Sequence, residues 1–460
     1  MSNDANQELP APSAAADPNK PLGAAERNWR RFVLFRVCFN SRFYYPVLAV
    51  FFLDLGLSPT QYTLLNFAWA IAIVLTDVPA GVLADRIGRK PLIVGAAFCM
   101  VAEMLLLLAA PLNGRATLFL FCLANRVLSG VAEGMASGAD EALVFDSLAE
   151  RGQSEQWPKV LDQVMRWQSV GMVIAMLLGG AAYDPHFMNF LGGVVGLPLH
   201  LVQATTLRFP IYLNLLTAVG AVWIVLGFRE PVLKRPHSAF AAPGQAESAS
   251  SAWSLLLTAA KWIFQTPAAS FILIGGLLID SSARLLLTFS SSYFRLISLP
   301  AASFGLLGAG MAGLGFFAAP LARKMVGSYT LATNYKLIAL ATIGALVGIA
   351  LKWPIWGAIF IAPLGTAMFA LGFMVSYYIN AIVESGHRAT VLSFKGLAFN
   401  LGYGFMGLLF AGMMKAFRGD SAPDQALASG FRLLPIFLAV AFGIFLLAFR
   451  RHAKATNTKF

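Results

Sequence analysis

A row of polar residues runs through an otherwise apolar stretch of this sequence. Arg126, Gly130, Glu133, Ser137 and Asp140 follow one another at alternating steps of four and three residues, so in a helix they share one face. Acidic and basic side chains on such a face can bind a charged solute, exchange protons or pair with each other. The spacing therefore predicts either one wall of an aqueous cavity or a buried ion-pair network that only packs helices.

Three other pairs of polar residues are four apart within apolar stretches, which places each pair on one helical face. They are Arg36 with Asn40, Asp162 with Arg166, and Asp280 with Arg284. Each pair has a structural alternative, because Arg36 can extend its charge to the membrane surface and the two acid–base pairs can neutralise themselves.

Single polar residues in apolar stretches add further candidates. Tyr378 and Asn400 are expected to give the C-terminal part of the chain a polar lining, whereas Glu103 stands alone and is expected to face a neighbouring helix. None of the five histidines falls in an apolar stretch, so carboxylates are the better candidates for carrying protons.

The composition around these charges excludes a water-soluble protein. Of 460 residues, 58% are hydrophobic and only 12% charged, against roughly 45–50% and about 25% in soluble proteins. The mean hydropathy is +0.69. The net charge of +12 does not indicate nucleic acid as a partner, because the basic residues are scattered over short loops. A polytopic helical membrane protein remains, in which each charge inside the bilayer costs about 2.5–3.5 kcal/mol and needs a reason.

A bilayer core of about 30 Å needs about 20 apolar residues per helix. This window predicts an all-α integral membrane protein with twelve transmembrane helices. They are expected near 32–53, 60–83, 92–110, 117–147, 160–182, 207–227, 268–292, 302–321, 337–352, 355–383, 391–414 and 433–449.

The loops predict the orientation of these spans. Placing both termini in the cytoplasm gives 21 Lys and Arg on the cytoplasmic side and 7 on the other, as the positive-inside rule requires. The longest cytoplasmic break divides the spans into two bundles of six. The expected units are a disordered cytoplasmic tail (1–30), an N-terminal bundle (31–228), a linker (229–266), a C-terminal bundle (267–450) and a second cytoplasmic tail (451–460).

The linker carries apolar residues at helical spacing: Trp253, Leu256, Leu257, Ala260 and Phe264. This pattern predicts a short amphipathic helix on the inner membrane surface, or alternatively an extended start of the seventh span.

Between the second and third spans the chain reads GVLADRIGRK. Gly81 allows a close approach between helices, and Gly88 allows a tight turn. Asp85, Arg86 and Arg89 supply the charges of the run. The run closely resembles the GxLaDrxGrk loop signature of the major facilitator superfamily. The resemblance covers the chain beyond its tail and implies two six-helix bundles that rock about a midplane site.

The resemblance extends to other motifs but is incomplete. Arg126-Val-Leu-Ser-Gly130 resembles the family's RxxqG pattern, which is associated with proton coupling. A second loop copy has Arg323 where the first half has Asp85, so a carboxylate-dependent latch is expected in the N-terminal half alone. In this latch, Asp85 caps a helix of the other half and Arg89 pairs with Asp146. The Gly-Pro motif of drug antiporters is absent after Gly171.

These observations predict a monomeric secondary transporter in the inner membrane of a bacterium, not an enzyme, with a small-molecule substrate and the lipid bilayer as partners. No cofactor, metal site or catalytic residue is expected, and the proton gradient is the expected energy source. Coupling through Glu133, tuned by Arg126, is predicted, with Asp280 as the alternative. The arginines favour an anionic or zwitterionic solute slightly. A proton-driven drug exporter, an uncoupled facilitator and a non-transporting sensor or scaffold remain alternatives.

Overall fold

The computed structural model describes residues 24–112, 115–231, 249–383, 388–418 and 423–452. Within these residues, all regular secondary structure is helical. The N-terminal part consists of α1 (Ala24–Asn40), η1 (Tyr45–Val47), α2 (Leu48–Asp54), α3 (Pro59–Ile87), α4 (Arg89–Ala109), α5 (Arg115–Ala136), α6 (Ala139–Ala149), η2 (Ser154–Gln156), α7 (Trp157–Tyr183), α8 (Pro185–Val194), α9 (Gln203–Thr206) and α10 (Phe209–Leu226).

The C-terminal part follows a linker helix, α11 (Ala249–Gln265). It consists of α12 (Pro267–Thr288), α13 (Ser290–Leu296), α14 (Ala302–Ser328), α15 (Leu331–Ala350), η3 (Trp356–Phe360), α16 (Ile361–Ile382), α17 (Arg388–Arg418), α18 (Pro423–Phe449) and η5 (Arg450–His452).

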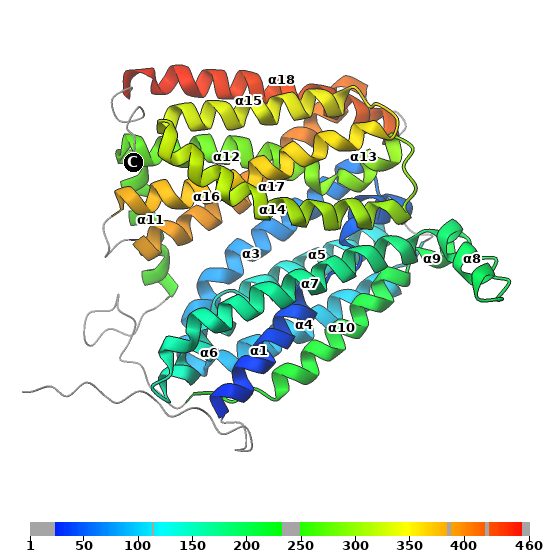
Figure 1. Ribbon diagram of the computed structural model, residues 1–460, viewed down its shortest axis with the longest axis horizontal. Coiled ribbons are helices and arrows are strands. Elements are labelled where there is room, and N and C mark those ends of the chain that lie inside the picture. The colour runs from blue at the N-terminus through cyan, green and yellow to red at the C-terminus, as the bar shows by residue number, and fades with distance from the viewer. Residues whose placement is uncertain (1–23, 113–114, 232–248, 384–387, 419–422, 453–460) are drawn as a thin grey trace, which may run out of the picture.

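The helices form two bundles, α1–α10 and α12–α18, that lie side by side (Figure 1). The start of α1 and the end of α18 lie at the same end of the molecule, here called the termini side. The opposite end, where α2, α9 and α13 lie, is called the far side. The bundles converge toward the far side and diverge toward the termini side.

Eleven helical segments among the described residues are long and apolar enough to cross a membrane. The remaining span, expected near 32–53, is interrupted, because α1 ends at Asn40 and α2 begins at Leu48. Pro46 lies in the first turn of η1, where its missing N–H is tolerated, so it fits the start of a new helix after the break. The N–H of Phe43 is satisfied by Asn214 Oδ1 at 2.8 Å. Twelve spans are therefore confirmed, but a continuous first span is wrong.

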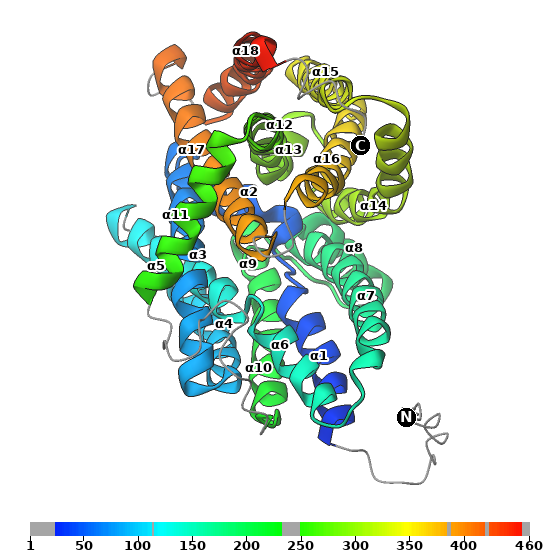
Figure 2. The same ribbon diagram turned by 90° about the vertical axis from the view of Figure 1, so that its left-hand side faces the viewer.

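The linker helix α11 is separate from the seventh span, because Thr266 has an extended conformation and Pro267 begins α12. It runs across α17 and α3, as the view from the termini side shows (Figure 2). Its buried residue Leu256 packs with Val74 of α3 and Leu397 of α17. A helix is present where the linker was expected to hold one. Leu257 and Phe264 are exposed and do not pack against the bundles.

The far side is where the two bundles touch most closely. A Cβ at Gly180 of α7 would lie 2.7 Å from the backbone nitrogen of Gly305 in α14, so only glycine allows this helix contact. Asp184 accepts a hydrogen bond from the Ala302 N–H at 3.0 Å and thereby links the end of α7 to the start of α14. These contacts close the far side in this conformation.

Candidate functional site

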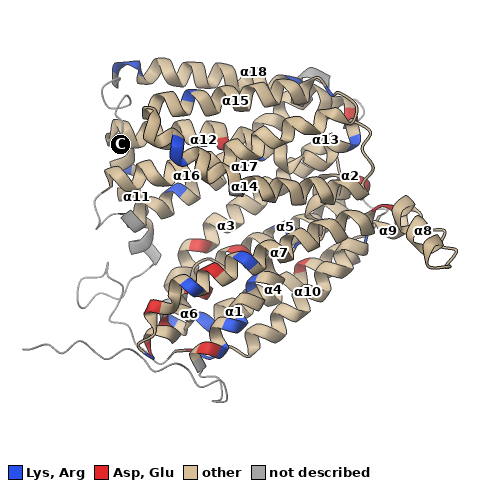
Figure 3. Ribbon diagram, in the orientation of Figure 1, with Lys and Arg blue, Asp and Glu red and all other residues tan. Residues whose placement is uncertain are grey.

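Charged side chains are concentrated in the N-terminal bundle, at the end where α1, α6 and α7 approach the termini side (Figure 3). Fewer charges lie deeper in the bundles. Some predicted site residues lie at the termini side and others lie deeper in the bundles. Many of them contact residues of other helices, which their spacing along one helix did not indicate.

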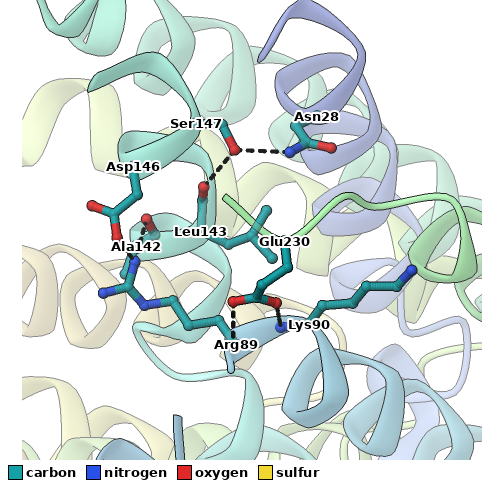
Figure 4. Close-up of polar contacts among 8 residues, drawn as sticks. All are labelled: Asn28, Arg89, Lys90, Ala142, Leu143, Asp146, Ser147 and Glu230. Carbon is teal, nitrogen blue, oxygen red and sulfur yellow. Dashed lines mark hydrogen bonds and ion pairs between the residues drawn. The ribbon is translucent and has the colours of Figure 1, made fainter. Parts of the chain in front are cut away.

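The loop between α3 and α4 makes the contacts drawn in Figure 4. Arg89 pairs with Asp146 of α6, and its Nη1 donates a hydrogen bond to the Ala142 carbonyl oxygen at 2.9 Å. The predicted Arg89–Asp146 contact is present, but it is formed while the bundles diverge on this side, so this contact by itself does not hold the termini side closed. It lies within the N-terminal bundle and fixes the start of α4 to α6.

Glu230, which follows α10, caps the start of α4. Its Oε1 accepts from the Arg89 N–H at 2.8 Å, and its Oε2 accepts from the Lys90 N–H at 2.7 Å. Gly88 is left-handed (φ +96°), and a Cβ there would lie 3.1 Å from the Glu230 carboxyl carbon. Sequence reasoning missed Glu230. The available signal was an acidic residue just after the sixth span, which does not reveal the helix that it caps.

The predictions for the other residues of the loop motif, Gly81, Arg86 and Asp85, compare with the structure as follows. A Cβ at Gly81 would meet nothing within 4 Å, so the close approach predicted there is wrong for this conformation. Arg86 is exposed. The predicted cap by Asp85 concerns a side chain that lies outside the described residues.

Asn28 ties three segments together beside this loop. Its Nδ2 donates to Ser147 Oγ at 2.8 Å and to the Arg229 carbonyl oxygen at 2.9 Å, and its Oδ1 accepts from the Arg229 N–H at 3.0 Å. The residue is 2% exposed. The start of α1, α6 and the chain after α10 are thereby held as one unit on the termini side (Figure 4).

The break between α1 and α2 carries a buried arginine. Arg42 pairs with Glu103 of α4, and their side chains are 1% and 0% exposed. Glu133 Oε1 of α5 lies 3.9 Å from Arg42 Nη2, and this side chain keeps 33% exposure. The prediction that Glu103 faces a neighbouring element is confirmed. Arg42 was missed, although its only signal, a charge inside the expected first span, was visible in the sequence.

Arg126 points at α3. Its Nη2 donates to Asn66 Oδ1 at 3.1 Å, and its guanidinium carbon lies 5.2 Å from the ring centre of Trp69. No carboxylate oxygen of the described residues lies within ion-pair distance of Arg126. The cation within ion-pair distance of Glu133 is Arg42, whereas the predicted partner Arg126 acts on Glu133 from a greater distance.

The predicted single face from residue 126 to 140 is wrong. Gly138 is left-handed (φ +71°) and separates α5 from α6, so Asp140 leaves the line of Arg126 and Glu133. Gly130 packs against α3, because a Cβ there would lie 2.6 Å from the Trp69 carbonyl oxygen.

Arg36 joins α1 to the start of α6. Its Nε lies 2.7 Å from Asp140 Oδ2, and its Nη2 lies 2.9 Å from Glu141 Oε1. Asn40 donates to the Arg36 carbonyl oxygen at 3.0 Å and so belongs to the same helix turn. Arg166 forms a local pair with the residue four positions earlier, is 74% exposed, and is not brought to the other candidates.

In the C-terminal bundle, Asp280 and Arg284 form the predicted pair at 2.9 Å. Arg284 Nη1 donates to Asn400 Oδ1 at 3.2 Å, so the predicted residue of α17 joins this group. Tyr378 does not join it. Its hydroxyl accepts from Asn334 Nδ2 at 2.6 Å and its side chain is 1% exposed, so in this conformation it is a buried packing residue.

On the far side, an ion pair connects the bundles. Both carboxylate oxygens of Asp54 lie 2.6 Å from guanidinium nitrogens of Arg295, and the Tyr183 hydroxyl donates to the same carboxylate. Burial lowers the pKa of Arg295, but the hydrogen bond and charge of Asp54 outweigh it, so the net pKa shift is upward. A pocket of about 1160 Å³ lies beside this group, between the α8–α9 segment and the start of α14.

A metal site is not indicated by the described part of the chain, where no group of three His, Cys, Asp or Glu side chains is arranged to hold an ion. The candidate site instead consists of ion pairs, some between helices of one bundle and one between the two bundles.

The family model of the Major Facilitator Superfamily matches residues 32–407. The chain belongs to the major facilitator superfamily. It is therefore a multi-pass membrane transporter for a small molecule, not an enzyme. No curated protein sequence matches it significantly.

Solved structures with similar folds include two transporters. The nucleoside transporter NupG matches with a TM-score of 0.70 and 14% identity, covering 93% of this chain and 99% of that chain. A bacterial homologue of the human lysosomal transporter Spinster, inward-facing and unoccupied, matches with a TM-score of 0.68 and 16% identity, covering 96% and 100%. At this identity the likeness concerns the fold.

Proposed function

We propose that this superfamily member moves a small anionic or zwitterionic solute across the inner membrane of a bacterium, as a monomer, and couples the movement to protons through Glu133. The observation that carries the proposal is the position of Glu133, a partly exposed carboxylate 3.9 Å from the buried Arg42–Glu103 pair.

The buried pair makes Glu133 responsive to its surroundings. Arg42 is enclosed and shares its charge between Glu103, which it contacts directly, and Glu133, which it reaches at 3.9 Å. When Glu133 binds a proton, the attraction between Glu133 and Arg42 is lost, and the break between α1 and α2 is free to adjust. Ionisable residues inside membranes commonly serve as proton carriers in this way.

Alternating access supplies the second step. The termini side is the cytoplasmic side in this proposal, and the far-side contacts Asp54–Arg295 and Asp184–Ala302 keep the outer entrance shut. These contacts must break for outward opening, while the α3–α4 loop must close against the other bundle. Proton binding at Glu133 changes the relative free energy of the two states.

The test is transport in proteoliposomes. Glu133→Gln is expected to abolish accumulation driven by a pH gradient while solute counterflow, which needs no proton movement, continues. Glu150→Gln, an exposed carboxylate after α6, is the matched control and is expected to behave like the unaltered protein. If the Glu133→Gln protein still accumulates solute when a pH gradient is applied, Glu133 is not the proton carrier. Asp280 is then the candidate, and Asp280→Asn tests it.

The same assay separates the alternative functions. Equal, gradient-independent flux by all variants identifies an uncoupled facilitator, and uptake restricted to lipophilic cations identifies a drug exporter. Nucleosides belong in the solute panel because NupG is a nucleoside transporter. Ligands are first selected by thermal stabilisation in detergent, where a solute at 100 times its dissociation constant adds about 2.7 kcal/mol.

A further inference from the structure

Two arginines, one in each bundle, are held in the same way. Each donates to the amide oxygen of an asparagine and lies over an aromatic ring three residues further along the asparagine's helix. The sets, here called the two arginine clamps, are Arg126 with Asn66 and Trp69, and Arg284 with Asn400 and Tyr403. The repetition of one local arrangement in both bundles indicates a shared purpose.

The clamps meet at the seam between the bundles. The rings of Trp69 and Tyr403 lie edge to face, with centroids 6.4 Å apart and an interplanar angle of 85°. Asn66 and Tyr403 also line a gap between α3, α12 and α17 that is too narrow to hold a water molecule in this conformation. The ring of one clamp therefore contacts the ring of the other where the two bundles touch.

The clamps lie among more positive than negative charges. Arg284 pairs with Asp280 at 2.9 Å, and the charge of Lys395 acts on the same carboxylate. Arg126 is 4% exposed, and within the described residues it has no carboxylate partner and its Nε has no hydrogen-bond acceptor. Burying a charge without a partner is costly, so a site of this kind favours an anion.

We propose that the two clamps together bind an organic anion with one carboxylate on a flat aromatic ring, an inference that rests on the proposed function and narrows its substrate class. The excess of positive charge favours an anion, and guanidinium groups bind carboxylates through two parallel hydrogen bonds. Trp69 is partly buried, and an aromatic ring that packs against it gains affinity beyond simple burial.

The arrangement also ties binding to movement. Because each bundle contributes one clamp and the two clamps already touch in this conformation, an anion that binds between them must part Trp69 from Tyr403 and then contacts both bundles. A ligand shifts a conformational equilibrium by its difference in affinity for the two states. An anion that contacts both bundles is therefore expected to shift the equilibrium between the two open states.

Equilibrium binding to the full-length protein in detergent tests the proposal with four matched probes. Benzoate has both features, cyclohexanecarboxylate has the charge without the aromatic ring, benzyl alcohol has the ring without the charge, and acetate has the charge alone. Benzoate is expected to bind at least tenfold more tightly than each of the others. Equal affinities for benzoate and cyclohexanecarboxylate would overturn the role of the aromatic rings.

Variants assign the binding to the clamps. Arg126→Gln and Arg284→Gln are each expected to weaken benzoate binding at least tenfold, and Trp69→Leu to remove most of its advantage over cyclohexanecarboxylate. Arg126→Lys keeps the charge without the planar fork, so it is expected to be intermediate even if the glutamine variant folds poorly. Arg151→Gln, which removes an exposed charge after α6, is the control. Unchanged benzoate affinity in both clamp arginine variants would refute the proposal.

Failure here is distinguishable from failure of the proposed function. If another solute is accumulated by a pH gradient in a Glu133-dependent manner while Arg126→Gln and Trp69→Leu leave it unaffected, the clamps are structural and coupling stands. If benzoate binds through the clamps but its flux ignores the pH gradient, the clamps stand and proton coupling falls.

Discussion

Among individual residues, Arg42 and Glu103 make the most enclosed charge contact, since neither side chain has more than 1% exposure. Removing one partner of a buried ion pair leaves the other charge without compensation and costs about 3–5 kcal/mol. Glu103→Gln is therefore expected to lower the unfolding midpoint of the purified protein strongly, as measured by thermal denaturation in detergent.

Two further variants complete this test. Replacing both partners by methionine removes both buried charges and is expected to recover most of the lost stability. Asp162→Asn breaks an ion pair between exposed side chains and is expected to cost no more than about 1 kcal/mol. A Glu103→Gln protein as stable as the parent would show that the pair contributes little to stability.

The difference between these pairs also explains what the sequence could predict at this scale. Asp280 and Arg284 were paired correctly because a four-residue step on one helix brings side chains together wherever the helix lies. Arg42 and Glu103 are 61 residues apart, and Arg126 reaches Asn66 from 60 residues away. Such contacts depend on how helices pack, which spacing along one helix does not report.

At the level of elements, Arg89 and Asp146 fix α4 to α6 at the termini side. If this side must close and reopen in every cycle, loosening the loop slows the movement and leaves the midplane site unchanged. Arg89→Ala is expected to reduce the transport rate several-fold with nearly unchanged solute affinity, measured by initial rates and equilibrium binding. In the control Lys90→Ala, the backbone contact to Glu230 remains, so normal transport is expected. If Arg89→Ala transports at the full rate, the Arg89–Asp146 contact does not act as a conformational latch.

The positions of the spans were predictable because each helix in a bilayer must satisfy its own backbone hydrogen bonds with about 20 apolar residues. Interruptions within a span were not predictable, because a break in a helix does not change the hydropathy of the stretch. The break at residues 41–44 depends on Asn214 of a distant helix to satisfy the Phe43 N–H, and the kink at Gly138 depends on one left-handed residue. Both breaks fall beside the charged residues, where regular helix would have placed the side chains differently.

For the whole molecule, the balance between its two open states depends on contacts that cross from bundle to bundle. On the far side these include the Asp54–Arg295 pair, the Asp184 link to the Ala302 N–H, and Ser291 Oγ, which accepts from the N–H groups of Ala49 and Val50. Toward the termini side the bundles diverge, although α11 spans α3 and α17 there (Figure 2). A change that weakens the far-side contacts should therefore move the whole population toward outward opening.

Asp54→Asn tests this balance. The Asp54 and Arg295 side chains are 20% and 41% exposed, so losing their attraction is worth about 1 kcal/mol, a shift of about fivefold between states. Spin labels at Thr205 and Trp353, in a background without Cys38, Cys99 and Cys122, report the distance across the far side. Asp54→Asn and Arg295→Gln are each expected to enlarge the long-distance population, and the exchange Asp54→Arg with Arg295→Asp to reduce it again. Identical distance distributions in all variants would mean that helix packing around Gly180 and Gly305, rather than this ion pair, keeps the far side closed.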